Sequence, residues 1–224
     1  MTSPALPACL IAVASAVVPF GASAHPHIFI DTAFRFVFDE AGLLTAVAID
    51  WTYDDFYSLL MIEENELDSD GDGTPEQDRL DAFAGHDVDW EAGYPGDFTV
   101  EWKGEAVPLS GPIEHEAHYD NGRITTSHTR MLSPAFDPKA DSVVARSYDP
   151  TYFVAYEVPT EPGIVGRDDC RIVRDAADKA KAQQEYGDQL AAIDVTGDPF
   201  EVVEVPDIGV LFADAFTLLC NAGS

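Results

Sequence analysis

"IFIDTAFRFVF" at residues 28–38 and "LTAVAIDWTY" at residues 44–53 share one pattern, in which apolar and polar side chains alternate. Alternation with a period of two places the apolar residues on one face of a β-strand. The intervening "DEAGL" has the composition of a turn. We therefore predict a β-hairpin with one buried face, and this hairpin sets the fold class.

Further strand-like segments follow between residues 98 and 158, and Asn121-Gly122 between two of them is a strong hairpin signal. The predicted strands are 98–102, 105–109, 113–119, 123–132, 141–149, 151–158, 200–205 and 210–220, with residues 159–166 as a loop. Apolar residues at helical spacing predict helices at 54–67, from 79 onward and at 175–193. The expected fold is α+β. It is mainly antiparallel and sandwich-like, with a helix–acidic loop–helix insertion at about 54–90 and one helix near the C-terminus.

The first 24 residues differ from the rest of the chain. Residues 10–20 are apolar but too few to span a bilayer, and Ala22-Ser23-Ala24 fits the site that signal peptidase cleaves. A membrane anchor is the alternative. We expect residues 1–24 to be a cleaved signal peptide, and residues 25–224 to form a single compact metal-binding domain in the periplasm without direct membrane insertion.

Two cysteines, Cys170 and Cys220, remain after that cleavage. In an oxidising compartment such a pair favours a disulfide over a metal site. A bridge closing so long a loop is worth roughly 4 kcal/mol in the chain-entropy treatment.

The charge balance is strongly acidic, with 12 basic and 41 acidic residues and a formal net charge of −29. Such a surface repels nucleic acid and anionic lipid, and it raises the local concentration of cations. We therefore expect no nucleic-acid partner. The charge by itself indicates solubility and names no ligand.

Two histidines, His25 and His27, lie at the start of the expected mature chain. In an extended segment they share one side, with Cα atoms about 6.5 Å apart. Pro26 has no backbone N–H, which excludes the square-planar copper or nickel site that needs a deprotonated second amide. A bis-imidazole site for Zn, Ni, Co or Cu remains, with or without the α-amine. The alternative is a frayed, polar terminus.

Further ligands for this site must come from the folded chain. An inward-facing His128 is the preferred third ligand, and Asp54 and Asp149 are carboxylate candidates. The structural alternatives are a helix N-cap for Asp54 and a turn before Pro150 for Asp149.

The segment "DSDGDG", residues 68–73, matches the first half of a calcium-binding loop. The expected calcium ligands are Asp68, Asp70, Asp72, Thr74, Glu76 and Asp78. The twelfth position, where such loops have a bidentate Glu, is Arg79. Either the loop is one residue short and Asp78 substitutes, or the affinity is low. A bound calcium ion would be structural, tying the two helices of the insertion together, and a solvated acidic turn is the alternative.

Several of these motifs together resemble a domain-of-unknown-function family of bacterial exported proteins. They occur in the same order, as "HPHIFID" (25–31), "WTYDDFYS" (51–58), "LDSDGDG" (67–73), "YDPTYFVAY" (148–156) and "FADAFTLLC" (212–220). The family is described as the periplasmic component of an uncharacterised ABC-type transport system, often encoded beside or fused to nickel/cobalt transporters. The family loop usually ends in Ser-Pro-Glu-Glu-Leu, whereas this chain has "TPEQDRL". The resemblance implies a role in transition-metal handling, with a separately encoded membrane metal transporter as partner.

The expected function is therefore a periplasmic accessory protein that delivers a transition-metal ion to or from a membrane transporter, and not an enzyme. One alternative is a copper-dependent redox enzyme with an N-terminal histidine brace, although no G-x-S-x-G or H-E-x-x-H motif accompanies it. The other alternative is a structural partner protein without a transition metal.

Overall fold

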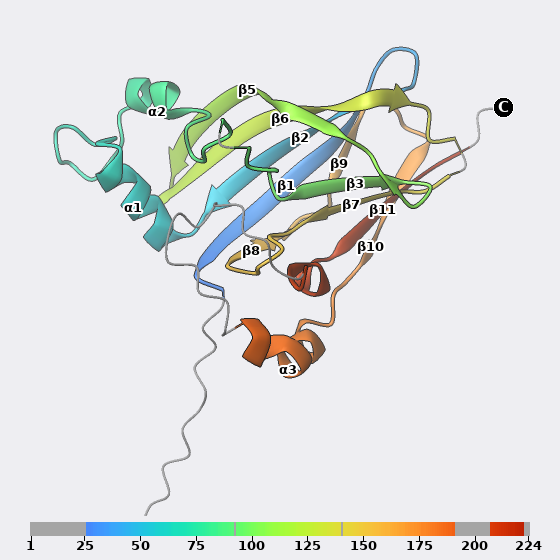
Figure 1. The fold of residues 1–224 in the computed structure, drawn as a ribbon. Helices are drawn as coiled ribbons and strands as arrows, with labels where there is room; N and C mark the ends of the chain where they lie inside the picture. Colours follow the sequence, from blue (N-terminus) through green and yellow to red (C-terminus); the bar gives the residue numbers. More distant parts are fainter. Residues whose placement is uncertain (1–25, 92, 140, 191–206, 222–224) are drawn as a thin grey trace, which may run out of the picture.

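The structure is a computed structural model that describes residues 26–91, 93–139, 141–190 and 207–221. The predicted signal peptide, His25 and the predicted strand 200–205 lie outside the described residues. The described residues form two β-sheets with a helical insertion at one end of the larger sheet (Figure 1).

The larger sheet has six strands in the described part of the chain, in the order β5-β6-β2-β1-β8, with β9 also paired to β1. The first hairpin is confirmed, because β1 and β2 pair antiparallel from Ile30 opposite Tyr53 to Phe38 opposite Leu44. The β5–β6 hairpin is also confirmed. Asn121 and Gly122 at its turn both have positive φ, as a type I′ turn requires. The strands are β1 Ile28–Phe38, β2 Leu44–Tyr53, β5 Leu109–Asp120, β6 Arg123–Phe136, β8 Val154–Glu157 and β9 Gly163–Val165.

The smaller sheet has the order β10-β11-β7-β3-β4 among the described residues. Its strands are β3 Phe98–Trp102, β4 Glu105–Ala106, β7 Val143–Ser147, β10 Cys170–Asp175 and β11 Ala215–Cys220. The predicted strand 210–220 is only partly right, because Gly209–Phe212 is a 3-10 helix, η1, and the strand begins at Ala215.

The two sheets pack face to face as a sandwich around a shared core. Phe34 of the larger sheet shows the contact: its ring meets those of Phe98 and Phe216 of the smaller sheet edge-on, at centroid distances of 5.0 and 5.4 Å. Edge-to-face pairs add to the stabilisation from burying apolar area. The expected mainly antiparallel, sandwich-like α+β fold is confirmed.

Two strands depart from the antiparallel expectation. β8 and β9 both pair with β1 in parallel, one after the other along the same edge. Residues 163–165, predicted as loop, form β9, a strand too short to show a period of two. β1 is therefore an inner strand, held on one side by its sequence neighbour and on the other by distant segments.

The insertion after β2 consists of two helices joined by the acidic loop, as predicted. α1 (Asp55–Glu64) packs against β6, and α2 (Gln77–Phe83) packs against β5 (Figure 1). None of the described helices combines the length and the apolar character needed to cross a membrane.

The predicted C-terminal helix is confirmed over a shorter range, as α3 (Lys179–Leu190). A small apolar cluster separate from the main core joins α3 to η1. Gly209 of η1 donates its N–H to the carbonyl of Pro150 at 2.9 Å, and a Cβ at this position would lie 1.7 Å from the carbonyl oxygen of Asp149. Only glycine fits here, so η1 lies directly against the 149–150 turn.

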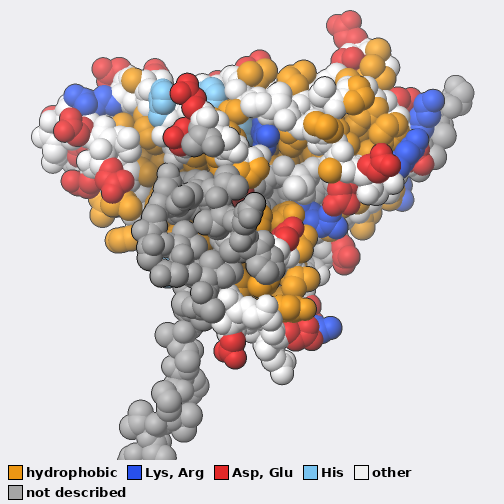
Figure 2. All heavy atoms as spheres, in the orientation of Figure 1, with side chains coloured by type: hydrophobic (Ala, Val, Ile, Leu, Met, Phe, Trp, Pro, Cys, Tyr) orange, Lys and Arg blue, Asp and Glu red, His pale blue; other side chains and the backbone are white. Residues whose placement is uncertain are grey.

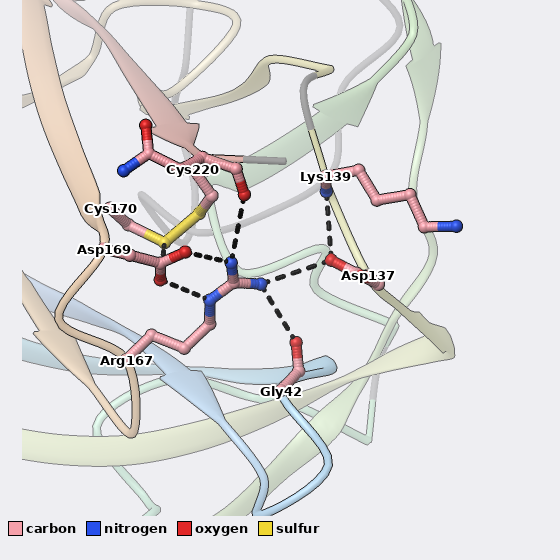
Figure 3. The surroundings of a disulfide bond; sticks show 8 residues. Gly42, Asp137, Lys139, Arg167, Asp169, Cys170 and Cys220 are labelled. Carbon is pink, nitrogen blue, oxygen red and sulfur yellow. Dashed lines mark hydrogen bonds and ion pairs between the residues drawn. A yellow bond between two sulfur atoms is a disulfide. The ribbon is translucent and has the colours of Figure 1, made fainter. Parts of the chain in front are cut away.

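The predicted disulfide between Cys170 and Cys220 joins β10 to β11. Beside it lies the guanidinium of Arg167, which bonds the carboxylates of Asp169 and Asp137 and the carbonyl of Gly42 (Figure 3). The bridge and this arginine together connect the C-terminal strand to the turn of the first hairpin.

Candidate metal-binding sites

His27 lies immediately before β1, and its partner in the predicted bis-imidazole site, His25, lies outside the described residues. The His27 backbone N–H donates to the carbonyl of Phe153 at 2.8 Å. Its imidazole packs against the Phe153 ring with centroids 4.6 Å apart. The side chain is exposed, so a residue with a metal-ligand ring is presented to solvent from a fixed backbone.

Asp54 lies next to this segment and holds it. One carboxylate oxygen accepts the N–H of Tyr57 at 2.8 Å, which makes Asp54 the N-cap of α1. The other oxygen accepts the N–H of Phe29 at 2.9 Å. Both oxygens therefore bond backbone donors, and the geometry supports the capping role that was the structural alternative to metal binding.

Asp149 also lies at this end of the sheet, where it organises the turn that carries Phe153. Its two oxygens accept four hydrogen bonds of 2.7–3.0 Å, from the N–H groups of Thr151, Phe153 and Val154 and from the Thr151 hydroxyl. Asp149 is buried. The fold thus brings His27, Asp54 and Asp149 to one end of β1, with both carboxylates engaged in holding the backbone.

His128 faces inward on β6, as predicted, but it is far from His27. In the sheet register Ile49 lies opposite both His128 and Phe34, so His128 is level with Phe34. Seven residues of strand separate Phe34 from His27, which corresponds to about 23 Å along the sheet. The structure does not bring His128 into a common site with His27.

The surroundings of His128 are aromatic. The ring lies edge-on to Trp51 and Trp90, with centroid distances of 4.7 and 5.2 Å, and Nε2 has no hydrogen-bond partner among the described residues. Burial, with smaller effects from Arg130 and His115, lowers the pKa of His128 to about 3. The ring is therefore neutral near pH 7 and forms part of the core.

The acidic loop brings three of its six predicted calcium ligands together. Ligand oxygens of Asp68, Asp70 and Glu76 all lie within 4.8 Å of one another, and no other such group of three metal-ligating side chains occurs among the described residues. Hydrogen bonds from the Ser69 hydroxyl and N–H lower the pKa of Glu76 to about 2, so this carboxylate stays ionised. The convergence of charged oxygens suits a hard cation such as Ca²⁺.

The other half of the loop is less complete. Asp72 accepts the N–H of Thr74 at 2.9 Å, and the Asp72 carboxylate does not belong to the group of three. Asp78 lies in the first turn of α2, outside the group as well. Arg79, at the twelfth position, donates to the carbonyl of Glu66 at 2.8 Å and thereby ties the two ends of the loop together.

A buried polar network lies between the sheets, and no sequence pattern indicates it. The hydroxyls of Tyr94 and Tyr156 are 2.9 Å apart. Burial, with a contribution from nearby Asp149, raises the pKa of Asp97 well above its usual range, while Arg130 opposes the shift. Asp97 and Arg130 are isolated charges in the sequence, and only folding brings them together.

A second place with metal-ligating side chains is a cavity between α1, residues 85–91 and β5. Histidine side chains (pale blue) show at the surface beside the helical insertion (Figure 2). Sequence analysis left His86 and His115 without a role. One feature of the sequence bears on His115: it lies three residues before His118 on one strand, so the two side chains must face opposite sides of the sheet.

Comparison with known proteins identifies the family of this chain. A comparison with curated proteins found no match. Residues 10–220 match a family described as "Protein of unknown function (DUF1007)". This match covers most of the sequence, and the chain therefore belongs to the DUF1007 family.

Proposed function

We propose that this protein is an extracytoplasmic metal-binding protein that holds a transition-metal ion at His25 and His27 and passes it to or from a membrane transporter. The observation that carries the proposal is the fixed, exposed position of His27. Its backbone is hydrogen-bonded to Phe153 and its ring is packed on the Phe153 side chain. A donor whose backbone is already ordered loses less conformational entropy when it binds an ion.

The anchors around this segment support the same proposal. Asp54 and Asp149 bond the backbone on either side of His27, through Phe29 and Phe153. Their negative charges lie near the ion without needing to coordinate it. Imidazole suits Zn, Ni, Co and Cu, and His25 would supply the second ring.

Two features support the location and the type of partner. The disulfide between Cys170 and Cys220 fits an oxidising compartment outside the cytoplasm. The net charge of −29 draws cations toward the surface. The transporter itself is proposed from the resemblance of this chain to exported transport components, as a separately encoded chain.

The test is calorimetric titration of the exported, processed protein with Zn²⁺, Ni²⁺, Co²⁺ and Cu²⁺, after sequencing of its N-terminus. The variant His25→Ala/His27→Ala should lose one tightly bound ion per chain, while the exposed His118→Ala variant keeps it. Unchanged stoichiometry in the double variant would contradict the proposal. A variant with one extra residue before His25 distinguishes two coordination geometries. It should abolish a site that uses the α-amine of His25, and it should spare a site that uses only the two imidazoles.

We also propose that the acidic loop binds Ca²⁺ as a structural ion. The convergence of Asp68, Asp70 and Glu76 supports this site. Ca²⁺ should raise the melting temperature of the parent protein, and Asp70→Asn should reduce that gain. Asp120→Asn, at an exposed position in the β5–β6 turn, is the control. A parent protein whose melting temperature ignores both Ca²⁺ and chelator would refute the site.

A further inference from the structure

The cavity between α1, residues 85–91 and β5 has a volume of about 820 Å³. Its wall carries the carboxylates of Glu64, Asp87, Asp89 and Glu91 and the imidazoles of His86 and His115. No lysine or arginine lines it among the described residues. Such a wall selects a cation, and the volume is that of a small-molecule pocket and far exceeds that of a bare ion.

The backbone of β5 is distorted where it delivers His115 to this cavity. The pairing register shifts between Ile113 and Glu116. The two residues within this bulge, Glu114 and His115, stand opposite the single residue His128 of β6. Glu114 has a φ of 59°, which is costly for a residue other than glycine. Bulges of this kind re-aim side chains and are common beside functional sites.

The end of α2 is shaped to receive the His115 ring. Gly85, just past the helix, has a φ of +82°, and a Cβ there would lie 2.7 Å from the ring. Only glycine allows this approach together with this backbone conformation. His86 follows directly and lines the same cavity, so imidazoles from two different segments of the chain line one cavity.

Asp87 is fixed beside them. One of its oxygens accepts the hydroxyl of Tyr53 at 2.9 Å and that of Thr126 at 2.5 Å. Burial raises the pKa of Tyr53 well above its usual range, so its hydroxyl remains a donor. The two neutral donors hold a carboxylate at the cavity wall in one orientation.

We propose that His115 and His86 bind a divalent transition-metal ion in this cavity, with the remaining coordination positions open to water or to a small molecule that accompanies the ion. Imidazole nitrogens are the donors that such ions prefer, and the surrounding carboxylates balance the charge. The two histidines lie on different elements from His25 and His27, so this site is independent of the terminal one.

The experiment uses the processed chain carrying His25→Ala/His27→Ala, with excess Ca²⁺ present to occupy carboxylate sites. Ni²⁺ is titrated by calorimetry and by quenching of tryptophan fluorescence, because Trp90 lines the cavity. One Ni²⁺ should bind per chain and quench the emission. Adding His115→Ala should weaken binding at least tenfold and remove the quenching, and His86→Ala should do the same from another element.

His118→Ala is the matched control. It lies on the same strand, its side chain is 59% exposed, and its ring contacts Glu116 away from the cavity. Absence of Ni²⁺ binding in the His25→Ala/His27→Ala background would overturn this inference and leave the terminal site standing. Equal effects of His115→Ala and His118→Ala would also overturn it. The parent protein could instead bind only one ion. If that ion is lost in His115→Ala and kept in His25→Ala/His27→Ala, the terminal site is refuted and the cavity site stands.

Discussion

The start of β1 and the cavity beside β5 contain the same kinds of side chain in different states. At the start of β1, Asp149 accepts four hydrogen bonds from the local turn and Asp54 accepts two from the backbone. At the cavity, carboxylates and imidazoles line an open volume. Both carboxylates at the start of β1 are held by backbone donors, whereas the Asp87 carboxylate at the cavity is held by two hydroxyl groups at the edge of an open volume.

The largest effect is expected where the carboxylate holds the backbone. Asp149→Ala leaves three buried or half-buried N–H groups without their acceptor, so we expect a loss of about 3 kcal/mol in the free energy of unfolding. Urea denaturation measures it. Glu91→Gln, at the cavity wall, should change stability by less than about 0.5 kcal/mol. Equal losses of unfolding free energy in Asp149→Ala and Glu91→Gln would contradict the structural role that distinguishes Asp149 from the cavity carboxylates.

The second effect concerns the core histidine, His128, and its control is an exposed histidine of the neighbouring strand. The pKa of folded His128 is about 3, below its ordinary value of 6.5, so between these pH values the unfolded chain binds a proton that the folded chain does not. The stability that the neutral ring contributes is complete above pH 6.5 and is lost as the pH falls through this window.

His128→Leu removes this titration. Between pH 6.5 and pH 5 the parent should lose about 2 kcal/mol of stability that the variant keeps, measured by denaturation at both pH values. The same substitution at exposed His118 serves as control and should alter the pH profile little. A variant that follows the parent through the acid range would show that His128 is not the group responsible.

The third and smallest effect is a difference of about 1 kcal/mol between two glycine variants, and it tests how the cavity is shaped. Gly85→Ala places a methyl group against His115 in a strained conformation, and we expect a cost of about 2 kcal/mol together with weaker Ni²⁺ binding. Gly104→Ala is the matched control, since the φ of Gly104 is +77° and a Cβ there would meet no atom within 4 Å. The control carries only the backbone strain, at about 1 kcal/mol. Identical costs would mean that the His115 contact imposes no constraint.

Sequence patterns were sufficient where the information is local. The alternation in 28–53 predicted the first hairpin, Asn121-Gly122 predicted the second turn, and Asp54 marked the start of α1. The disulfide followed from the number of cysteines and the expected compartment. Each of these features depends on a few neighbouring residues or on a simple count.

Features that depend on distant partners could not be predicted in the same way. An inward-facing His128 was the preferred third ligand, but no local pattern placed this residue along the sheet relative to His27. The parallel pairing of β8 and β9 with β1 has no local signal. The bulge at Glu114 also has no local signal, because it directs His115 against Gly85, a residue from a distant segment of the chain.

The parallel pairing of β8 with β1 also makes the start of β1 depend on a distant part of the chain. His27 is anchored by Phe153, a residue from the far half of the chain, so the first hairpin can form long before its leading end is secured. Contacts between such distant segments form slowly, because a large loop must close first. The backbone position of His27 therefore depends on closing a loop that extends to Phe153.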